Sequence, residues 1–410
     1  MPEFLTLIPP AQAIQTLLAA LELQPAAEEV DTERALWRVS ACPVTAPYPL
    51  PSFSRSTVDG YAVRAADTYG ASESLPAYLL VAGEAPMGAA VDFAVGPGQC
   101  ALIHTGGMLP QGADAVVMVE NTQPARPGEV ELLKAAAVGE NVLKVGEDVQ
   151  AGQEVIPAGA RLRPAEIGGL MALGLTRVAV ARRPRVAILS SGDEVVPPAA
   201  PLGPGQVRDV NSYSLGALVE QAGGTAVLYG ILPDRAEALQ AAAGRALAEC
   251  DLVVITAGSS ASARDLTSTV IDALGSPGVL VHGVEVRPGK PTILAACRGK
   301  AVIGLPGNPV SALVIARLFV IPVIERLLGL TEARPAPVVT ARLALNLPSQ
   351  AGREDWVAVR LHGQPGDYQA EPVFGKSNLI FTLARADGLL RIPPDATGLS
   401  AGERVDVVLL

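Results

Sequence analysis

One apolar run and the loop that follows it constrain this chain most. The run 251–256, Asp-Leu-Val-Val-Ile-Thr, is rich in β-branched residues, which predicts a buried strand. The loop from Gly258 to Asp265 begins with small residues and leads into a predicted helix. Small residues after a strand let backbone N–H groups surround an anion, and a helix start adds further donors. This pattern is typical of a phosphate-binding loop in which Asp265 shares a divalent cation with the phosphate. A plain polar connection with Asp265 as a helix cap is the alternative.

Strands and helices alternate on both sides of this run. Further strands are predicted over 185–191, 226–229 and 301–305, and helices over 211–222, 235–249 and 310–328. Asn211 is expected to cap the first of these helices, which ends at Gly223-Gly224. Such alternation predicts βαβ units and a largely parallel sheet.

Ligands of such sheets bind beyond the carboxyl ends of the strands, where three polar loops are expected. The first loop holds Glu194 and the second is 258–265. The third is Pro306-Gly307-Asn308-Pro309-Val310-Ser311, which opens an apolar helix. A further turn, Arg287-Pro288-Gly289-Lys290-Pro291, presents two cations. Each loop alone could be ordinary turn chemistry, but their convergence in one sheet indicates a site for an anion.

The N-terminal half predicts a β-rich region. Short strands are expected over 77–81, 100–105, 115–119 and 129–133, separated by Gly and Pro. Asp59 lies in a Ser/Thr-rich turn, Thr105 at a strand end and Asp148 after Gly146. A structural turn is the alternative to a catalytic Asp59. His104 is more typical of a half-buried residue with satisfied hydrogen bonds than of a ligand.

The two ends of the chain carry no catalytic cluster of their own. Near the N-terminus, Ile14, Leu17, Leu18 and Leu21 recur at helical spacing, which predicts an apolar stripe that faces a core, with contacts in a dimer as the alternative. After a Pro-rich linker over 331–337, the tail to Leu410 shows short alternating strands with Gly turns, a pattern typical of a small barrel.

Composition excludes some functions. The formal charge is −10, which argues against nucleic acid or an anionic membrane as the main partner. The four cysteines are far apart, so neither a zinc site nor a disulfide framework is indicated, and a reducing cytoplasm is expected. No signal peptide or membrane-spanning run is predicted.

Several short motifs follow one another along the chain. They are Ser56-Thr57-Val58-Asp59-Gly60-Tyr61-Ala62, Thr105-Gly106, Gly146-Glu147-Asp148, Ser191-Gly192-Asp193-Glu194, Arg287-Pro288-Gly289-Lys290-Pro291 and Pro306-Gly307-Asn308-Pro309-Val310-Ser311-Ala312. The motifs stand in the order found in the molybdopterin molybdenumtransferases, the family of MoeA and the gephyrin E-domain, and the chain resembles this family over nearly its whole length.

The resemblance implies an α/β multidomain protein in four parts. These are a discontinuous, dimerising domain over 1–30 and 145–180, a β-rich lever over 31–144, a molybdopterin-binding α/β domain over 181–330 and a C-terminal β-barrel over 337–410. It implies a homodimeric transferase of molybdenum cofactor biosynthesis, which inserts molybdate into adenylylated molybdopterin with Mg²⁺ and releases AMP. An adenylyltransferase would be the partner that supplies the substrate.

The resemblance also implies roles for residues. The catalytic candidates are Asp59, Asp148, Glu194 and Asp265, of which Glu194 and Asp265 would bind the metal. The substrate-binding candidates are Thr105, Gly258, Ser259, Ser262, Arg287, Lys290, Gly307, Asn308, Pro309 and Ser311, with Arg287, Lys290 and Ser311 as partners for molybdate.

One loop departs from the family pattern. Where the family commonly has Gly-Gly-Val-Ser-Val-Gly and an acidic residue before the aspartate, this chain is one residue shorter and has Arg264. Fewer glycines leave less freedom for positive φ. Three alternative interpretations remain open. The chain is a divergent paralogue, its product is a tungsten analogue of the cofactor, or it is a non-catalytic pterin-binding scaffold. A molybdopterin adenylyltransferase, whose fold the α/β domain resembles, is a further alternative, although the large N-terminal region and the barrel argue against it.

Overall fold

The computed structural model describes residues 7–257, 261–330 and 337–410, with side chains described except at 257 and 261–265. The chain forms two compact units. Unit 1 comprises Met1–Cys42, Ala158–Arg163 and Arg177–Leu410, and unit 2 comprises Pro43–Pro157 and Pro164–Thr176. The four-part division expected from the sequence is finer than this one and stays a prediction.

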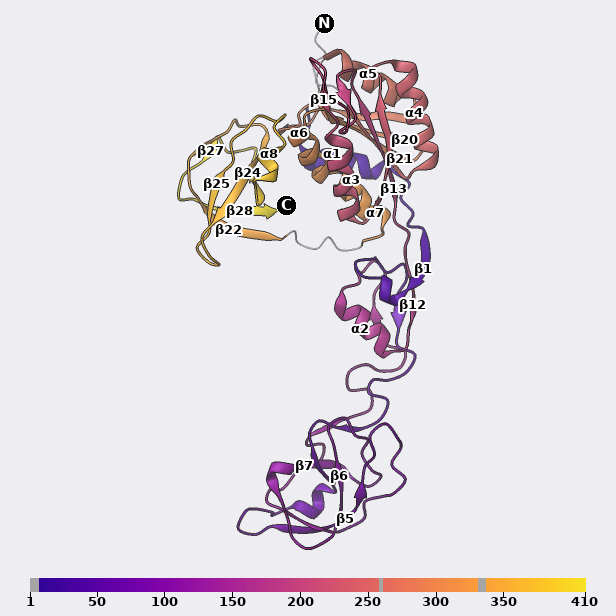
Figure 1. The fold of residues 1–410 in the computed structure, drawn as a ribbon, viewed down its shortest axis with the longest axis vertical. Helices are drawn as coiled ribbons and strands as arrows, with labels where there is room; N and C mark the ends of the chain where they lie inside the picture. The colour runs from indigo at the N-terminus through magenta and orange to yellow at the C-terminus, as the bar shows by residue number, and fades with distance from the viewer. Residues whose placement is uncertain (1–6, 258–260, 331–336) are drawn as a thin grey trace. The chain divides into compact units, whose positions relative to one another are not determined.

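A six-stranded sheet forms the centre of unit 1 (Figure 1). Its strands, in spatial order, are β16 (Thr225–Leu232), β13 (Arg185–Ser191), β17 (Leu252–Ala257), β21 (Lys300–Pro306), β20 (Ile293–Cys297) and β18 (Pro277–His282). The first four run parallel to one another, whereas β20 and β18 are antiparallel to their neighbours. The predicted α/β fold with a mostly parallel sheet is therefore confirmed.

Helices cover both faces of this sheet (Figure 1). They are α1 (Pro10–Ala19), α3 (Asn211–Ala222), α6 (Pro309–Ile315) and α7 (Ile321–Leu327) on one face, and α4 (Ala236–Glu249) and α5 (Ala261–Asp272) on the other. Alternate residues of β13 enter different cores: Val186 and Ile188 pack with the α3 side, and Ala187 and Leu189 with the α4 side. A strand buried on both faces must be apolar throughout, which explains the unbroken hydrophobic runs.

Two helices differ from the expectation, one in its cap and one in its interior. Asn211 does not cap α3; instead the Asp209 carboxylate accepts a hydrogen bond from the Ser212 N–H at 3.0 Å, and the Asn211 amide donates to the Gly307 carbonyl at 2.8 Å. The helix ends at Gly223 with φ +96°, as predicted. The helix expected over 310–328 is continuous but contains a π-helical turn at Ala316–Val320 between α6 and α7.

The C-terminal part of unit 1 is a closed barrel of five strands. They are β22 (Val338–Leu343), β24 (Glu354–His362), β25 (Gln369–Pro372), β26 (Gly388–Ile392) and β28 (Arg404–Leu409). The ring closes because β24 pairs with both β25 and β26. A short strand of the α/β part, β19 (Val286–Arg287), pairs with β24 and joins the barrel to the turn that carries Lys290.

Smaller elements complete unit 1. They are β1 (Ala27–Asp31), η1 (Thr32–Arg34), β12 (Arg177–Ala181), β14 (Val195–Val196), β15 (Val207–Arg208), β23 (Leu347–Pro348), α8 (Phe381–Ala384) and β27 (Gly398–Leu399). The stripe of the N-terminal helix faces a core as predicted, with Leu17 fully buried and Leu18 packed beside it.

Unit 2 is built around a second sheet of six strands, which confirms the β-rich insert. In spatial order these strands are β7 (Ala115–Met118), β4 (Gly60–Val63), β6 (Gln99–Ile103), β5 (Ala77–Glu84), β9 (Glu129–Leu132) and β8 (Thr122–Pro124). Its other elements are β2 (Val44–Thr45), β3 (Arg55–Ser56), η2 (Ala65–Thr68), η3 (Val119–Asn121), β10 (Val142–Leu143), β11 (Glu154–Ile156) and α2 (Pro164–Ala172). In neither unit does a described helix have the length and apolar composition needed to cross a lipid bilayer.

Candidate active site

A cavity of about 1090 Å³ in unit 1 is lined by loops of the α/β part and of the barrel. This volume lies at the upper end of the range for small-molecule sites. Among the residues whose side chains are described, four cations and two carboxylates line the cavity, namely Arg287, Lys290, Arg353, Lys376, Glu285 and Asp355. Because cations outnumber carboxylates in a chain of net negative charge, this wall favours an anionic ligand.

The turn after β19 places two predicted residues at this cavity. Asp355 is buried and accepts a hydrogen bond from Arg353 at 2.9 Å, while the Arg287 guanidinium lies 3.8 Å from its other oxygen. Lys290 is exposed at the cavity, and within the described part of the chain its ammonium group has no ion pair. The lysine therefore presents an uncompensated charge to any bound anion.

The loop before α6 forms a second part of the wall. Asn308 donates to the Ser377 hydroxyl at 3.0 Å, and the Ser377 carbonyl accepts from the Val310 N–H at 3.0 Å. Ser311 is buried and belongs to the cavity lining. Of the four residues predicted in this loop, Asn308 and Ser311 line the cavity, whereas Gly307 and Pro309 do not. The structure thus brings Arg287, Lys290, Asn308 and Ser311 together around one cavity.

The barrel contributes residues that the sequence did not suggest. Arg353, Lys376, Asn378 and Thr382 all line the cavity. The only sequence signal was the polar group Lys376-Ser377-Asn378 after Gly375, which by itself reads as an ordinary turn. Nothing in the sequence indicates that this turn lies beside a loop of the α/β domain.

The two predicted metal ligands stand in different positions. Glu194 lies in the turn after β13, exposed, and its backbone carbonyl accepts the Val207 N–H at 2.8 Å. Asp265 and Ser262 fall in the first five residues of α5, of which the structure describes only the backbone, and Gly258 and Ser259 lie outside the described residues.

The donor set can be tested against Mg²⁺. In the part of the chain with described side chains, no three His, Cys, Asp or Glu residues form a metal-binding group. Mg²⁺ usually takes one or two carboxylates together with substrate phosphates, so a large cluster is not required. In the same part of the chain, no hydrogen bond to the Glu194 carboxylate is found. The Glu194 carboxylate is thus exposed and, among the described residues, accepts no hydrogen bond, as a ligand of a substrate-bound cation would require.

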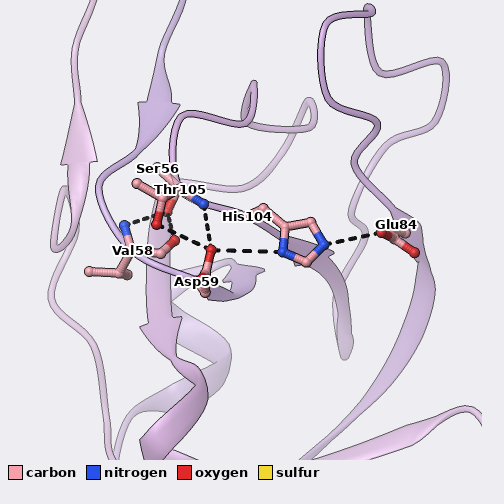
Figure 2. A network of polar contacts seen from close by, with 6 residues as sticks. All are labelled: Ser56, Val58, Asp59, Glu84, His104 and Thr105. Carbon is pink, nitrogen blue, oxygen red and sulfur yellow. Dashed lines mark hydrogen bonds and ion pairs between the residues drawn. The ribbon is translucent and has the colours of Figure 1, made fainter.

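Unit 2 carries a second group of polar residues, shown in Figure 2. One oxygen of Asp59 accepts hydrogen bonds from the Thr105 N–H at 2.7 Å and from the Thr105 hydroxyl at 3.1 Å. The His104 Nδ1 lies 3.7 Å from the same oxygen, and its Nε2 lies 3.1 Å from Glu84. These contacts lower the pKa of Asp59, first through the Thr105 N–H, then through its hydroxyl, and to a smaller extent through His104. Asp59 is therefore held as a carboxylate.

The loop with Thr105 is fixed by the backbone. The Gly106 N–H donates to the Ser56 carbonyl at 2.8 Å, and the Ser56 N–H donates to the Gly107 carbonyl at 3.0 Å. Gly106 has φ +86°, a conformation that L side chains rarely adopt. The Asp59 and Thr105 motifs were expected as separate turns, and the structure joins them.

Asp148 takes no part in this group. Its N–H donates to the Leu50 carbonyl at 3.0 Å and its side chain is exposed. Among the described residues, it makes no hydrogen bond to Asp59. Unit 2 therefore presents Asp59 and Thr105 together, and Asp148 separately.

Comparisons with known proteins agree with this architecture. Residues 8–174 match the MoeA N-terminal region (domain I and II), residues 187–326 the probable molybdopterin binding domain, and residues 340–410 the MoeA C-terminal region (domain IV). A molybdopterin molybdenumtransferase from Nostoc sp. is 37% identical, over 98% of this chain and 92% of its own length. One from Bacillus subtilis is 33% identical, over 99% and 94%.

Solved structures give the same answer. The crystal structure of a molybdopterin biosynthesis MoeA protein from Pyrococcus horikoshii is 37% identical, covers 98% of this chain and 99% of its own, and superposes with a TM-score of 0.83. By sequence and by fold over its whole length, this chain belongs to the MoeA family of molybdopterin molybdenumtransferases.

Proposed function

We propose that this protein inserts molybdate into adenylylated molybdopterin and releases AMP, in molybdenum cofactor biosynthesis. The observation that carries the proposal is the cavity that Arg287, Lys290, Arg353, Lys376 and Ser311 line together. Molybdate is a dianion and the adenylylated pterin carries phosphates, so both require cations and hydrogen-bond donors. The curated relatives are named for this transfer, which supports the same reaction here.

The residues of the cavity suggest how the reaction is assisted. Lys290 and Ser311 would bind the molybdate oxygens, while Arg287, whose charge is shared with Asp355, would orient the phosphates. Glu194 and Asp265 would hold Mg²⁺, which neutralises charge on a pyrophosphate link while it is cleaved. Gly258, Ser259 and Ser262 would bind the same phosphates through their loop, and Asp59, Thr105 and Asp148 would complete the site.

We further propose that the enzyme is a cytoplasmic homodimer with shared active sites. Asp59 of one subunit would act with Asp265 of its partner, as the resemblance to the family implies. A dimer of one Asp59→Asn and one Asp265→Asn subunit would then hold both lesions in one site and leave the other intact.

Mixing the two inactive homodimers under conditions of subunit exchange should restore about a quarter of wild-type activity, because half of the dimers are mixed and each has one intact site. Differently tagged subunits verify the exchange. No recovery in verified mixed dimers would refute the shared site.

The reaction itself is tested with the purified protein, adenylylated molybdopterin, Mg²⁺ and molybdate. We expect AMP release and reconstitution of a molybdenum enzyme, and loss of both when Mg²⁺ is chelated. Lys290→Ala and Ser311→Ala should raise the KM for molybdate more than they weaken pterin binding, whereas Lys134→Ala, a change of an exposed lysine in unit 2, should have no effect. Pterin binding without AMP release would instead indicate a scaffold protein.

An adenylyltransferase is less well supported. Its reaction would produce, rather than consume, the adenylylated pterin, and the matches to the MoeA N- and C-terminal regions lie outside the pterin-binding domain. Incubation with ATP and molybdopterin distinguishes the two reactions, because only an adenylyltransferase would form adenylylated molybdopterin.

A further inference from the structure

Three titratable side chains of unit 2 meet at one edge of its sheet. Asp59 directly precedes β4, Glu84 is the last residue of β5, and His104 directly follows β6. Strand β6 runs parallel to β5 and antiparallel to β4, with Leu102 opposite Glu84 and Ile103 opposite Gly60. The end of β6 therefore lies between the end of β5 and the start of β4, and His104 lies between the two carboxylates (Figure 2).

The pairing of β4 makes this meeting possible. A Cβ at Gly60 would lie 1.9 Å from the Val117 carbonyl oxygen, so only glycine allows β4 to pair closely with β7 at this point. Asp59 is consequently held at the edge of the sheet, and among the described residues its hydrogen bonds and ion pair are all made by the oxygen Oδ1. The second oxygen, Oδ2, is left for a ligand.

We propose that His104 is a positioning residue, which links Glu84 to Asp59 and fixes the orientation of the Asp59 carboxylate toward substrate. Glu84 orients the imidazole through Nε2, so that Nδ1 faces Asp59 Oδ1. The imidazole held in this way gives Asp59 Oδ1 a third contact beside the two from Thr105, which restricts rotation of the carboxylate. The role of His104 rests on the proposed function, because His104 acts through Asp59. The contacts among Glu84, His104 and Asp59 do not depend on that function.

These contacts contribute little to the stability of the fold. The side chains of Asp59, Glu84 and His104 are 60%, 61% and 45% exposed. Ion pairs at such exposed positions contribute little to folding. A loss of activity without a loss of thermal stability would therefore reflect positioning.

The barrel offers a matched control. His362 Nε2 lies 2.7 Å from Glu371, with side-chain exposures of 48% and 54%, and this pair does not line the cavity. His104→Gln should lower kcat about tenfold, as is typical when the partner of a functional group is lost. It should leave the KM for molybdate and the melting temperature unchanged. His362→Gln should leave kcat unchanged.

Two further variants test the linkage. Glu84→Gln should lower kcat in the same direction as His104→Gln. In an Asp59→Asn background, His104→Gln should cause no further loss, because residues that act through one another are not additive. Equal activity of His104→Gln and His362→Gln, or a full additional tenfold loss in the Asp59→Asn background, would overturn the proposal.

A readout without turnover separates this proposal from the proposed function. In a titration of carboxyl ¹³C signals, His104→Gln should raise the pKa of Asp59, because one group that lowers it is removed, and His362→Gln should not. If the wild type released no AMP but this change occurred, the proposed function would fail while the contact between His104 and Asp59 stood. An unchanged Asp59 titration in His104→Gln would overturn the positioning role even in an active enzyme.

Discussion

Gly289 lies where the cation-bearing turn contacts the helix that carries Ser311. Its φ is +123°, and a Cβ at this position would lie 2.3 Å and 2.4 Å from Cγ1 and Cδ1 of Ile315, which is fully buried. Overpacking of a core typically costs about 1–3 kcal/mol. The backbone conformation adds about 1–2 kcal/mol for a residue with a Cβ. Gly289→Ala should therefore destabilise unit 1 by about 2–5 kcal/mol.

The same substitution should impair the reaction. Since Arg287 and Lys290 flank Gly289, displacement of the turn moves both cations relative to Ser311. A misplacement of about 1 Å can cost about a hundredfold in rate. We expect kcat/KM for molybdate to fall by this order, which AMP release measures under conditions where the variant is folded.

Urea unfolding followed by tryptophan fluorescence measures the stability, because both tryptophans, Trp37 and Trp356, belong to unit 1. Gly230→Ala is the control: φ there is +81°, but no atom lies within 4 Å of the added Cβ, so only the backbone cost applies. In the Gly289→Ala background, Ile315→Ala should cost less than in the wild type, because it removes the overlap. Equal losses for Gly289→Ala and Gly230→Ala would refute the steric explanation.

Three further predictions concern other parts of the chain. Thr105→Val should raise the pKa of Asp59 in a carboxyl ¹³C titration without restoring the ordinary value near 3.8, because the Thr105 N–H, the larger cause, remains. An Asp59 titration that is unchanged in Thr105→Val would contradict this prediction. Because folding lowers the pKa of Asp59, its contribution to stability is fully present at a pH above the ordinary pKa and is lost as the pH falls through the lowered folded-state pKa. Of the four cysteines, a thiol reagent should modify Cys42 rapidly and the three buried ones only after unfolding, and mass spectrometry identifies the sites. Lys300 donates to two carbonyl oxygens at the end of α4, both at 2.8 Å. Lys300→Met should therefore lower the unfolding free energy by about 2 kcal/mol in a urea titration. A loss below about 0.5 kcal/mol would contradict this role.

The sheet of unit 1 was predictable because its signal is local. Strands such as β13 and β17 are buried on both faces, which requires unbroken apolar runs that a sequence displays directly. The loops at their carboxyl ends follow from the rule for parallel sheets. This rule was enough to predict the loop of Asn308 and Ser311 at the sheet's edge, whereas the roles of Arg287 and Lys290 in the site were implied by the resemblance to the family.

Contacts between distant segments were not predictable in the same way. Lys376 and Ser377 reach the cavity only because the barrel packs there, and no local pattern reports such packing. Glu84 meets His104 only because the pairing of β5 with β6 shifts between Val81 and Gly83. Helix α2 was missed because it contains Gly168-Gly169, which lower helix propensity, and buries only Leu170.

Unit 2 lies within the sequence of unit 1, and this has a consequence for folding. Strand β1 pairs with β12, Asp31 with Arg177, so this pairing must close a loop that contains all of unit 2. Closing a long flexible loop is entropically costly. Within unit 2, however, β2 pairs with β11 near the points where the chain enters and leaves its main segment. If unit 2 folds first, its ends are already close, and β1 and β12 are joined by a short connection. Translation delivers the segments in an order that suits this sequence of events, since the main segment of unit 2 is synthesised before β12.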